Sequence, residues 1–216
     1  MFDEIISELE NTNTQLVAVS KTQPNAQLQP LYDKGQRVFG ENYVQELVDK
    51  YATMPKDIQW HFIGHLQSNK VKYIAPFVAM IHSVDSLKLL QEIDKQALKN
   101  NKIIKCLLQF HIAEEETKFG LDTEGVILFL ESDAFNQLKN IELCGVMGMA
   151  TFTDDKTQVK KEFQALKRIF DTLKTTYFAD NQSFKDISMG MSDDYKLAIQ
   201  EGSTMVRIGS LIFGKR

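Results

Sequence analysis

Lys21 is the first residue in the chain whose chemistry could go beyond packing. It follows the apolar run Leu16–Val19 and Ser20, so it stands at the tip of the first strand-like segment. On this fragment alone, a solvated residue just past a strand is the favoured interpretation. A desolvated lysine, however, loses its proton readily, and a neutral amine can form a Schiff base with a carbonyl group. The choice between the two interpretations depends on what the fold places beside Lys21.

Two small-residue segments near the other end of the chain have the composition of a phosphate site. They are SMGMSDD, residues 188–194, and RIGS, residues 207–210. Their glycines would let the backbone approach a ligand, and their serines offer hydroxyl groups. Ser192 could instead cap a helix, with Asp193 and Asp194 favouring the helix dipole. A helix cap and a phosphate site are compatible at these residues. The residues predicted to bind a phosphate are Ser188, Gly190, Ser192, Gly209 and Ser210.

The elements that must position these residues alternate between two hydrophobic periods. Eight short β-branched or aromatic runs are separated by seven segments with apolar residues at i, i+3 and i+4, such as SLKLLQEIDKQALK. This alternation predicts a parallel sheet with helical crossovers. The predicted strands are Leu16–Ser20, Arg37–Gly40, Ile58–Gly64, Phe77–Val84, Ile103–Phe110, Ile141–Met149, Asp186–Met191 and Thr204–Gly209.

Eight such units predict an α/β fold, a single (β/α)8 barrel of the TIM type, in one domain over residues 1–216. No full helix follows the last strand, so the amphipathic segment at residues 2–10 is expected to complete the ring of helices. A doubly wound open sheet is the alternative. That fold usually carries a G-x-G-x-x-G loop after its first strand, and VSKTQPNAQ contains none.

Barrel proteins bind ligands at the carboxyl ends of their strands, which would place Lys21 across the mouth from the phosphate site. Two ligand classes fit: a phosphosugar, as in a Schiff-base aldolase, or pyridoxal 5′-phosphate. Arg207 favours the second, because it alternates with Val206 and Ile208 and should point into the mouth. A guanidinium donates hydrogen bonds but cannot accept them, so it would keep a pyridine nitrogen unprotonated. Such a cofactor is a weak electron sink.

Composition narrows the function classes further. The net charge of −4 and the lack of a basic stripe argue against nucleic-acid binding. No apolar stretch approaches the ~20 residues of a membrane span, and the acidic N-terminus is no signal peptide, so we expect a cytoplasmic protein. Cys106 and Cys144 should be buried, reduced thiols. The scattered histidines lack ligand spacing, so no metal site is expected, and His61 and His82 should alternate with core positions.

Seven blocks in order and spacing resemble the YggS/PROSC family of pyridoxal-phosphate homeostasis proteins. They are AVSKT, VFGENYVQE, WHFIGHLQSNK, HSVDS, GVMGMA, SMGMSDD and GSTMVRIGSLIFG, and they cover almost the whole chain. The resemblance implies a barrel of the alanine racemase N-terminal type. It also implies a role in intracellular vitamin B6 homeostasis, with pyridoxal 5′-phosphate held as a Schiff base on Lys21. It gives no defined cofactor contact to His65, Ser83 or Asp85. The implied cofactor-binding residues are Lys21, Asn42, Ser188, Gly190, Met191, Ser192, Arg207, Gly209 and Ser210.

The resemblance to alanine racemases also implies limits on the chemistry. Those enzymes use a second, β-rich domain that supplies a tyrosine base, and we expect that domain to be absent after Ser210. Met149 stands where the racemase pattern has a histidine. We therefore expect no catalytic residues and no significant turnover; the alternative is a weak racemase-like enzyme with Lys21 as its single base. A monomer is expected, and recipients of the cofactor would be apoenzymes that use it.

Overall fold

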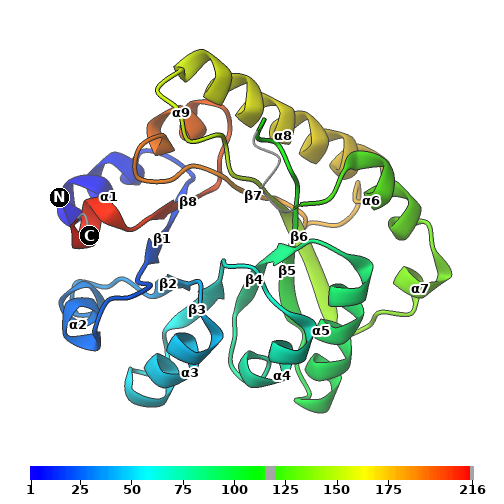
Figure 1. The fold of residues 1–216 in the computed structure, drawn as a ribbon, viewed down its shortest axis with the longest axis horizontal. Coiled ribbons are helices and arrows are strands. Elements are labelled where there is room, and N and C mark those ends of the chain that lie inside the picture. The colour runs from blue at the N-terminus through cyan, green and yellow to red at the C-terminus, as the bar shows by residue number, and fades with distance from the viewer. Residues whose placement is uncertain (115–119, 215–216) are drawn as a thin grey trace.

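Eight parallel strands form a closed barrel in the computed structural model, which describes residues 1–114 and 120–214 (Figure 1). Each strand pairs with the next along the chain, and the last returns to the first. The (β/α)8 barrel predicted from the sequence is confirmed, and the open sheet is excluded. The strands are β1 (Gln15–Val19), β2 (Val38–Glu41), β3 (Gln59–Phe62), β4 (Met80–Val84), β5 (Ile104–Gln109), β6 (Ile141–Met147), β7 (Asp186–Ser188) and β8 (Met205–Ile208).

Helices cover the outside of the barrel (Figure 1). Four of them have side-chain caps at their N-termini, supplied by Ser86, Asp122, Ser132 and Asp155. The Ser86 hydroxyl, for example, accepts the Leu89 N–H, and the Asp155 carboxylate accepts the Thr157 N–H. The helices are α1 (Phe2–Glu10), α2 (Asn25–Asp33), α3 (Val44–Thr53), the 3₁₀ turn η1 (Ser68–Lys70), α4 (Val71–Ile74), α5 (Leu87–Lys99), α6 (Thr123–Leu130), α7 (Asp133–Asn136), α8 (Lys156–Thr176), α9 (Tyr195–Gln200) and α10 (Ser210–Phe213).

Helix α1 takes the place that a helix after β8 would fill. Its Ile5 and Leu9 lie in one buried cluster with Leu16 of β1 and with Val206 and Ile208 of β8. The segment that does follow β8, α10, has a single turn. Figure 1 shows the two ends of the chain side by side at this point. The expectation that the N-terminal segment completes the ring is confirmed.

Alternate residues of each strand face opposite sides of the barrel wall. Val17, Met80 and Met205 belong to a small apolar cluster inside the barrel. Their neighbours along each strand face outward and pack against the helices. The same alternation carries past the strand ends. Lys21 is four residues after Val17, and Arg207 is two after Met205, so both start from the inner face of the wall.

Six strands are shorter than the sequence predicted: β5, β6 and β8 by two residues each, and β3, β4 and β7 by three. β4 begins at Met80, because the residues before it belong to the turn after α4. β3 loses residues at both ends, starting at Gln59 and stopping at Phe62. β7 ends at Ser188, because Gly190 takes a φ of +93° that turns the chain out of the sheet. These differences move no strand to another place in the barrel.

The two thiols behave as the sequence predicted. Cys106 and Cys144 are buried and form no disulfide. Burial raises the pKa of both thiols, that of Cys144 to about 12, so neither is a reactive thiolate at neutral pH. Within residues 1–114 and 120–214, no helix has both the length and the apolar character needed to cross a bilayer.

Candidate functional site

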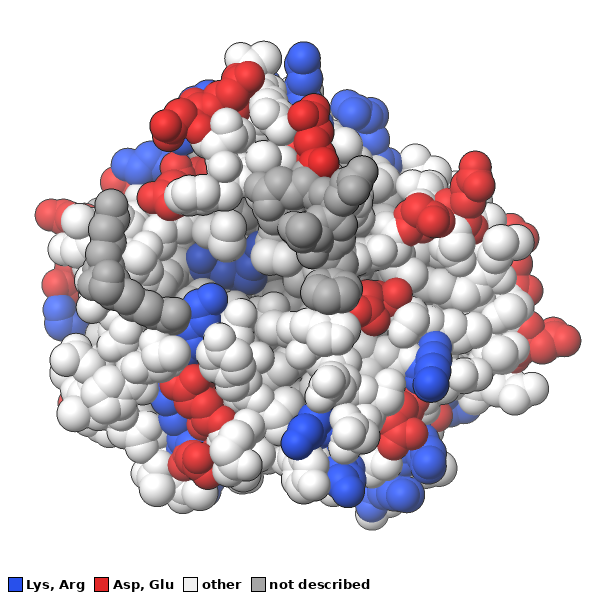
Figure 2. Space-filling model, viewed as in Figure 1, with Lys and Arg blue, Asp and Glu red and all other residues white. Residues whose placement is uncertain are grey.

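The carboxyl ends of the strands open into a cavity of about 370 Å³. That volume falls in the range of small-molecule sites, roughly 300–1,000 Å³. Lys21 and Arg207 are its two cationic residues. Figure 2 shows this side of the molecule hollowed near its centre, with Lys or Arg atoms inside the hollow. The lining residues are Val19, Lys21, Gln23, Asn42, Ile63, Met149, Phe152, Met191, Ser192, Asp193, Arg207, Gly209, Ser210, Phe213 and Gly214.

The cavity brings together seven of the nine residues predicted to bind the cofactor: Lys21, Asn42, Met191, Ser192, Arg207, Gly209 and Ser210. It does not include Ser188, which is fully buried inside the barrel and bonded to other side chains. Gly190 does not line the cavity either. A Cβ at Gly190 would lie 2.5 Å from the Ala198 Cβ of α9, so the absence of a side chain lets this turn pack closely on α9. Ser188 and Gly190 are therefore the two predicted residues that do not line this cavity, and their phosphate contacts stay a prediction.

Lys21 occupies a tight turn directly after β1. The Gln23 N–H donates to Ser20 O at 3.0 Å, which closes a four-residue turn around Lys21 and Thr22. Thr22 has a φ of +63°, as the third residue of a type II turn requires, although glycine is usual there. A β-branched residue in this region stores roughly 1–3 kcal/mol and persists only where its surroundings hold it. The strain therefore lies directly beside the predicted anchor.

Arg207 is buried at the inner end of the cavity. Its Nη1 donates to the carbonyl and hydroxyl oxygens of Ser188, both at 2.7 Å, and its Nη2 donates to Gly148 O at 3.0 Å. Burial lowers the Arg207 pKa to about 10, so the side chain is still charged at neutral pH. A guanidinium has five N–H donors. Three bonds within the protein leave donors for a ligand in the cavity that Arg207 lines.

A row of hydrogen-bonded side chains continues from Arg207 into the barrel. Ser188 Oγ lies 3.0 Å from His82 Nδ1, and His82 Nε2 lies 2.9 Å from His61 Nδ1. Burial lowers the pKa of both histidines, that of His61 to about 3. Both alternate with core residues as predicted, since Trp60 and Phe62 flank His61 and Ile81 precedes His82, and both histidines are themselves buried. The row itself was not predicted, because its members come from β3, β4, β7 and β8 and meet only when the barrel closes.

These histidines should make the fold less stable in acid. Their pKa values in the folded protein lie below the unfolded value of about 6.5, so only the unfolded chain takes up these protons as the pH falls. Each histidine should remove about 2 kcal/mol from the free energy of unfolding between pH 6.5 and pH 5. Denaturant unfolding of the wild type at pH 7 and pH 5 measures this loss.

The double variant His61→Gln/His82→Gln is the control, since it removes the titration but keeps side chains that form hydrogen bonds. Its unfolding free energy should change much less between the two pH values. Burial raises the pKa of Asp186 to about 6, which acts in the opposite direction but equally in both proteins. A double variant that loses as much stability as the wild type would contradict the assignment to these histidines.

The loop after β7 is arranged differently from the helix cap considered above. Helix α9 begins at Tyr195, so Ser192 does not cap it. Asp194 Oδ1 accepts the Met191 N–H at 2.6 Å, which turns this carboxylate toward its own loop and away from the cavity wall. Asp193 does line the cavity. One of the two aspartates therefore still opposes an anion there.

Backbone donors at the two loops suit an anionic group. Ser192 Oγ accepts the Gly209 N–H at 3.4 Å, which joins the loop after β7 to the end of β8. Across the part of the chain that the structure describes, the N–H groups of Ser192 and Ser210 donate to no protein acceptor. Both residues line the cavity. Backbone N–H groups available at a cavity wall are the usual donors to phosphate oxygens.

The other predicted residues differ in their relation to the cavity. Asn42 lines it, and its Oδ1 is buried with no hydrogen-bond partner among the described residues. Such an orphan acceptor is rare unless a ligand or water donates to it. His65 Nδ1 lies 3.3 Å from Asp85 Oδ2, and neither residue lines the cavity, nor does Ser83. No group of three or more His, Cys, Asp or Glu side chains in residues 1–114 and 120–214 is placed to hold a metal ion.

Sequence reasoning missed several apolar residues of the wall, among them Val19, Ile63 and Phe213. Strand alternation could have identified two of them. Ile63 is two residues beyond the inward-facing His61, and Val19 is two beyond Val17. Phe213 had no such signal, since it belongs to the short helix α10 rather than to a strand.

The family model described as the N-terminal domain of alanine racemase matches residues 2–216. An alanine racemase from Bartonella henselae superposes with a TM-score of 0.73 at 17% identity, over 100% of this chain and 59% of that one. At that identity the likeness shows the fold alone. The barrel is thus the one that alanine racemases also use.

Curated relatives are much more similar in sequence. The pyridoxal phosphate homeostasis protein of Aquifex aeolicus is 40% identical over 93% of this chain and 86% of its own length. The human protein of the same name is 40% identical over 93% of this chain and 76% of its own. PipY of Synechococcus elongatus, solved with PLP bound, has a TM-score of 0.86 at 32% identity over 98% and 99% of the two chains. This chain therefore belongs to the family of pyridoxal phosphate homeostasis proteins, as the seven sequence blocks predicted.

Proposed function

We propose that this chain binds pyridoxal 5′-phosphate in the cavity at the barrel mouth, with Lys21 as its covalent anchor, and serves the homeostasis of that cofactor. The observation that carries the proposal is the shared cavity: Lys21, Arg207 and the two serine-containing loops all line it. Lys21 stands at the end of β1, while Arg207 and the loops come from β7 and β8. The structure of PipY with PLP bound supports the same ligand for this chain.

The polar groups of the cavity fit the parts of this cofactor. The N–H groups of Ser192 and Ser210 would receive the phosphate, and the remaining Arg207 donors would face the pyridine nitrogen. The buried Asn42 Oδ1 needs a donor that the described residues do not supply. Attachment would join Lys21 Nζ to the aldehyde carbon and release the aldehyde oxygen as water, without oxidant or reductant. When bound, the cofactor supplies an electron sink, which Arg207 keeps weak by donating to its ring nitrogen.

We infer that the chain has no significant catalytic turnover. Within the described residues, no tyrosine or histidine lines the cavity, and Met149 occupies the wall at the end of β6. Lys21 would therefore have to exchange protons with a bound amino acid. Asp193 is the carboxylic acid that also lines the cavity. Slow single-base chemistry through Lys21 is the most that this set of residues supports.

The remaining parts of the proposal concern the setting of this function. We propose that the protein acts as a monomer with one domain over residues 1–216, in the cytoplasm, and releases its cofactor to apoenzymes that use it. Neither nucleic acid nor membrane is a partner in this proposal. The net charge of −4 supports the first point. Size-exclusion chromatography with light scattering, at several protein concentrations, tests the monomer.

Titration of the purified protein with pyridoxal 5′-phosphate tests the binding function. One equivalent should bind and give a yellow protein with a visible absorbance band, because the linked C=N bond extends the conjugation of the ring. Borohydride should then fix the label on the peptide that contains Lys21, as read by mass spectrometry. A protein that stays colourless, or a label that maps mainly to other lysines, would overturn the proposal.

A further inference from the structure

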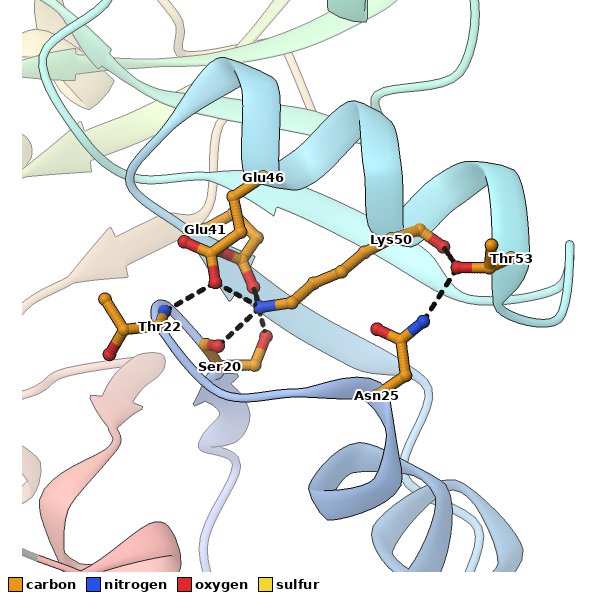
Figure 3. Close-up of polar contacts among 7 residues, drawn as sticks. All are labelled: Ser20, Thr22, Asn25, Glu41, Glu46, Lys50 and Thr53. Atoms are coloured by element: carbon orange, nitrogen blue, oxygen red, sulfur yellow. Dashed lines mark hydrogen bonds and ion pairs between the residues drawn. The ribbon is translucent and has the colours of Figure 1, made fainter.

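A buried ionic cluster lies behind the turn that carries Lys21. Helix α3 contributes Lys50 and Glu46, β2 contributes Glu41, and Ser20 and Thr22 come from the turn itself (Figure 3). We call these five residues the Lys50 cluster. Lys50 Nζ donates to Ser20 O at 2.6 Å, to Glu41 Oε1 at 2.6 Å and to Glu46 Oε1 at 2.7 Å. All three ammonium protons are therefore engaged.

The cluster holds the backbone on both sides of Lys21. Lys50 binds the carbonyl oxygen of Ser20, the residue before it. Glu46 Oε1 accepts the N–H of Thr22, the residue after it, at 2.5 Å. Figure 3 shows the side chains of Lys50 and Glu46 converging on this turn from α3. The ion pair between Lys50 and Glu46 thus holds one backbone group on each side of Lys21.

The contacts also account for the strained conformation of the turn. Thr22 keeps a φ of +63° while its N–H is held by Glu46. The Ser20 hydroxyl donates to Glu41 Oε1 at 2.6 Å, so Ser20 is tied through both its side chain and its carbonyl group. A residue in a sparsely populated region persists where its neighbours over-determine it. Here the over-determining contacts come from the Lys50 cluster.

Burial argues that the cluster is more than a stabilising ion pair. The Lys50 side chain is 5% exposed and that of Glu41 is 0% exposed. Two carboxyl groups share one ammonium, and Glu41 Oε2 has no hydrogen-bond partner among the described residues. Burial raises the pKa of the Glu41 carboxyl. Apolar residues of similar volume usually stabilise a core as well as a buried ion pair does, so stability alone does not explain this arrangement.

We propose that Lys50 and Glu46 are positioning residues for Lys21: they clamp the turn on both sides of the anchor and so aim its amine into the cavity. The proposal rests on the proposed function, since it concerns how fast and how completely the anchor captures the cofactor. Neither residue lines the cavity, so their effect passes through the backbone of the turn.

The test compares Glu46→Ala with Asp49→Ala. Both residues lie on α3, but Asp49 is exposed, and within the described residues its side chain bonds only to Gln45. Two ligands separate positioning from general binding. Pyridoxal 5′-phosphate can attach to Lys21, whereas pyridoxine 5′-phosphate has the same ring and phosphate but an alcohol in place of the aldehyde. Stopped-flow absorbance gives the rate constant of attachment, and competition gives the Kd of the second ligand.

Glu46→Ala should slow attachment at least tenfold and leave the Kd of pyridoxine 5′-phosphate within twofold of wild type. Asp49→Ala should change neither. Glu46→Gln keeps a carbonyl oxygen that can accept the Thr22 N–H, so it should recover most of the rate. Lys50→Met should slow attachment as Glu46→Ala does. If Lys50→Met folds poorly, the comparison of Glu46→Ala with Glu46→Gln still tests the proposal, because the Glu46 side chain is 23% exposed and tolerates substitution better.

Equal weakening for both ligands would mean that the cluster supports the cavity as a whole, and would overturn the positioning role. An unchanged rate in Glu46→Ala would overturn it as well. A wild-type protein that binds pyridoxine 5′-phosphate but never attaches pyridoxal 5′-phosphate would instead overturn the proposed function. The same measurements therefore distinguish a failure of the positioning role from a failure of the proposed function.

Discussion

Replacing Lys21 by alanine should abolish covalent attachment of pyridoxal 5′-phosphate and weaken its binding by roughly a hundredfold, or about 2.8 kcal/mol. The covalent link depends on a single amine, while the loop N–H groups and Arg207 remain to bind the phosphate and ring. Absorbance titration should therefore show no yellow band, and borohydride should add no label to the peptide over the turn. The noncovalent binding that remains in Lys21→Ala should have a Kd similar to that of pyridoxine 5′-phosphate, as measured by competition between the two ligands.

Lys156→Ala is the matched control for Lys21→Ala. Lys156 lies near the mouth, in the depressions beside Asp193, but it does not line the cavity. Its removal should leave the yellow band and the affinity within twofold of wild type. A Lys21→Ala protein that still forms the band would show that another amine is the anchor. Loss of the band in Lys156→Ala would point to that residue.

Much of the fold could be predicted from the sequence because two periods alternate so regularly. Parallel strands buried on both faces read as short apolar runs, and each run here corresponds to one strand of the barrel. Strand ends were less accurate, since they depend on local geometry such as the left-handed Gly190. The helix that completes the ring, α1, was predictable by counting, because no other helical segment was left for the gap between β8 and β1.

The predicted site residues that line the cavity lie at or beyond a strand end, as Lys21 and Arg207 do. Ser188 does not line the cavity, because it is still inside β7 and faces the barrel interior. The predicted strand Asp186–Met191 already contained Ser188, and the period of the strand places it on the same side as Asp186. Contacts such as that between His61 and His82 carry no local signal, because they join different strands.

The Lys50 cluster was beyond sequence reasoning for a different reason. The segment VQELVDKYA predicted a helix, and α3 is there. Lysine is almost never fully buried unless it is paired, so a lysine on a surface helix is expected in solvent. Lys50 is buried because Glu41 ends β2 on the outer face of the wall, directly under α3. That pairing arises only when helix and strand pack together.

Replacing Arg207 by methionine should cost about 3–5 kcal/mol of folding free energy. The change leaves the two oxygens of Ser188 and the carbonyl oxygen of Gly148 without the donors they now have. Each buried polar group that loses its partner costs about 1–3 kcal/mol. For a chain of this size the midpoint of thermal unfolding should fall by about 10 °C. Calorimetry of the protein without added cofactor measures the change.

Arg37→Met is the control, because Arg37 lies near solvent, where it pairs with Asp57 and donates to the carbonyl oxygens of Tyr32 and Gln36, so its loss should cost clearly less than that of the buried Arg207. Arg207→Lys separates charge from geometry. An ammonium keeps the positive charge but cannot span Ser188 and Gly148 as the planar fork does, so about half of the loss should remain. A midpoint for Arg207→Met that matches Arg37→Met would contradict the structural role. If stability falls while cofactor affinity is unchanged, Arg207 supports the barrel without touching the ring.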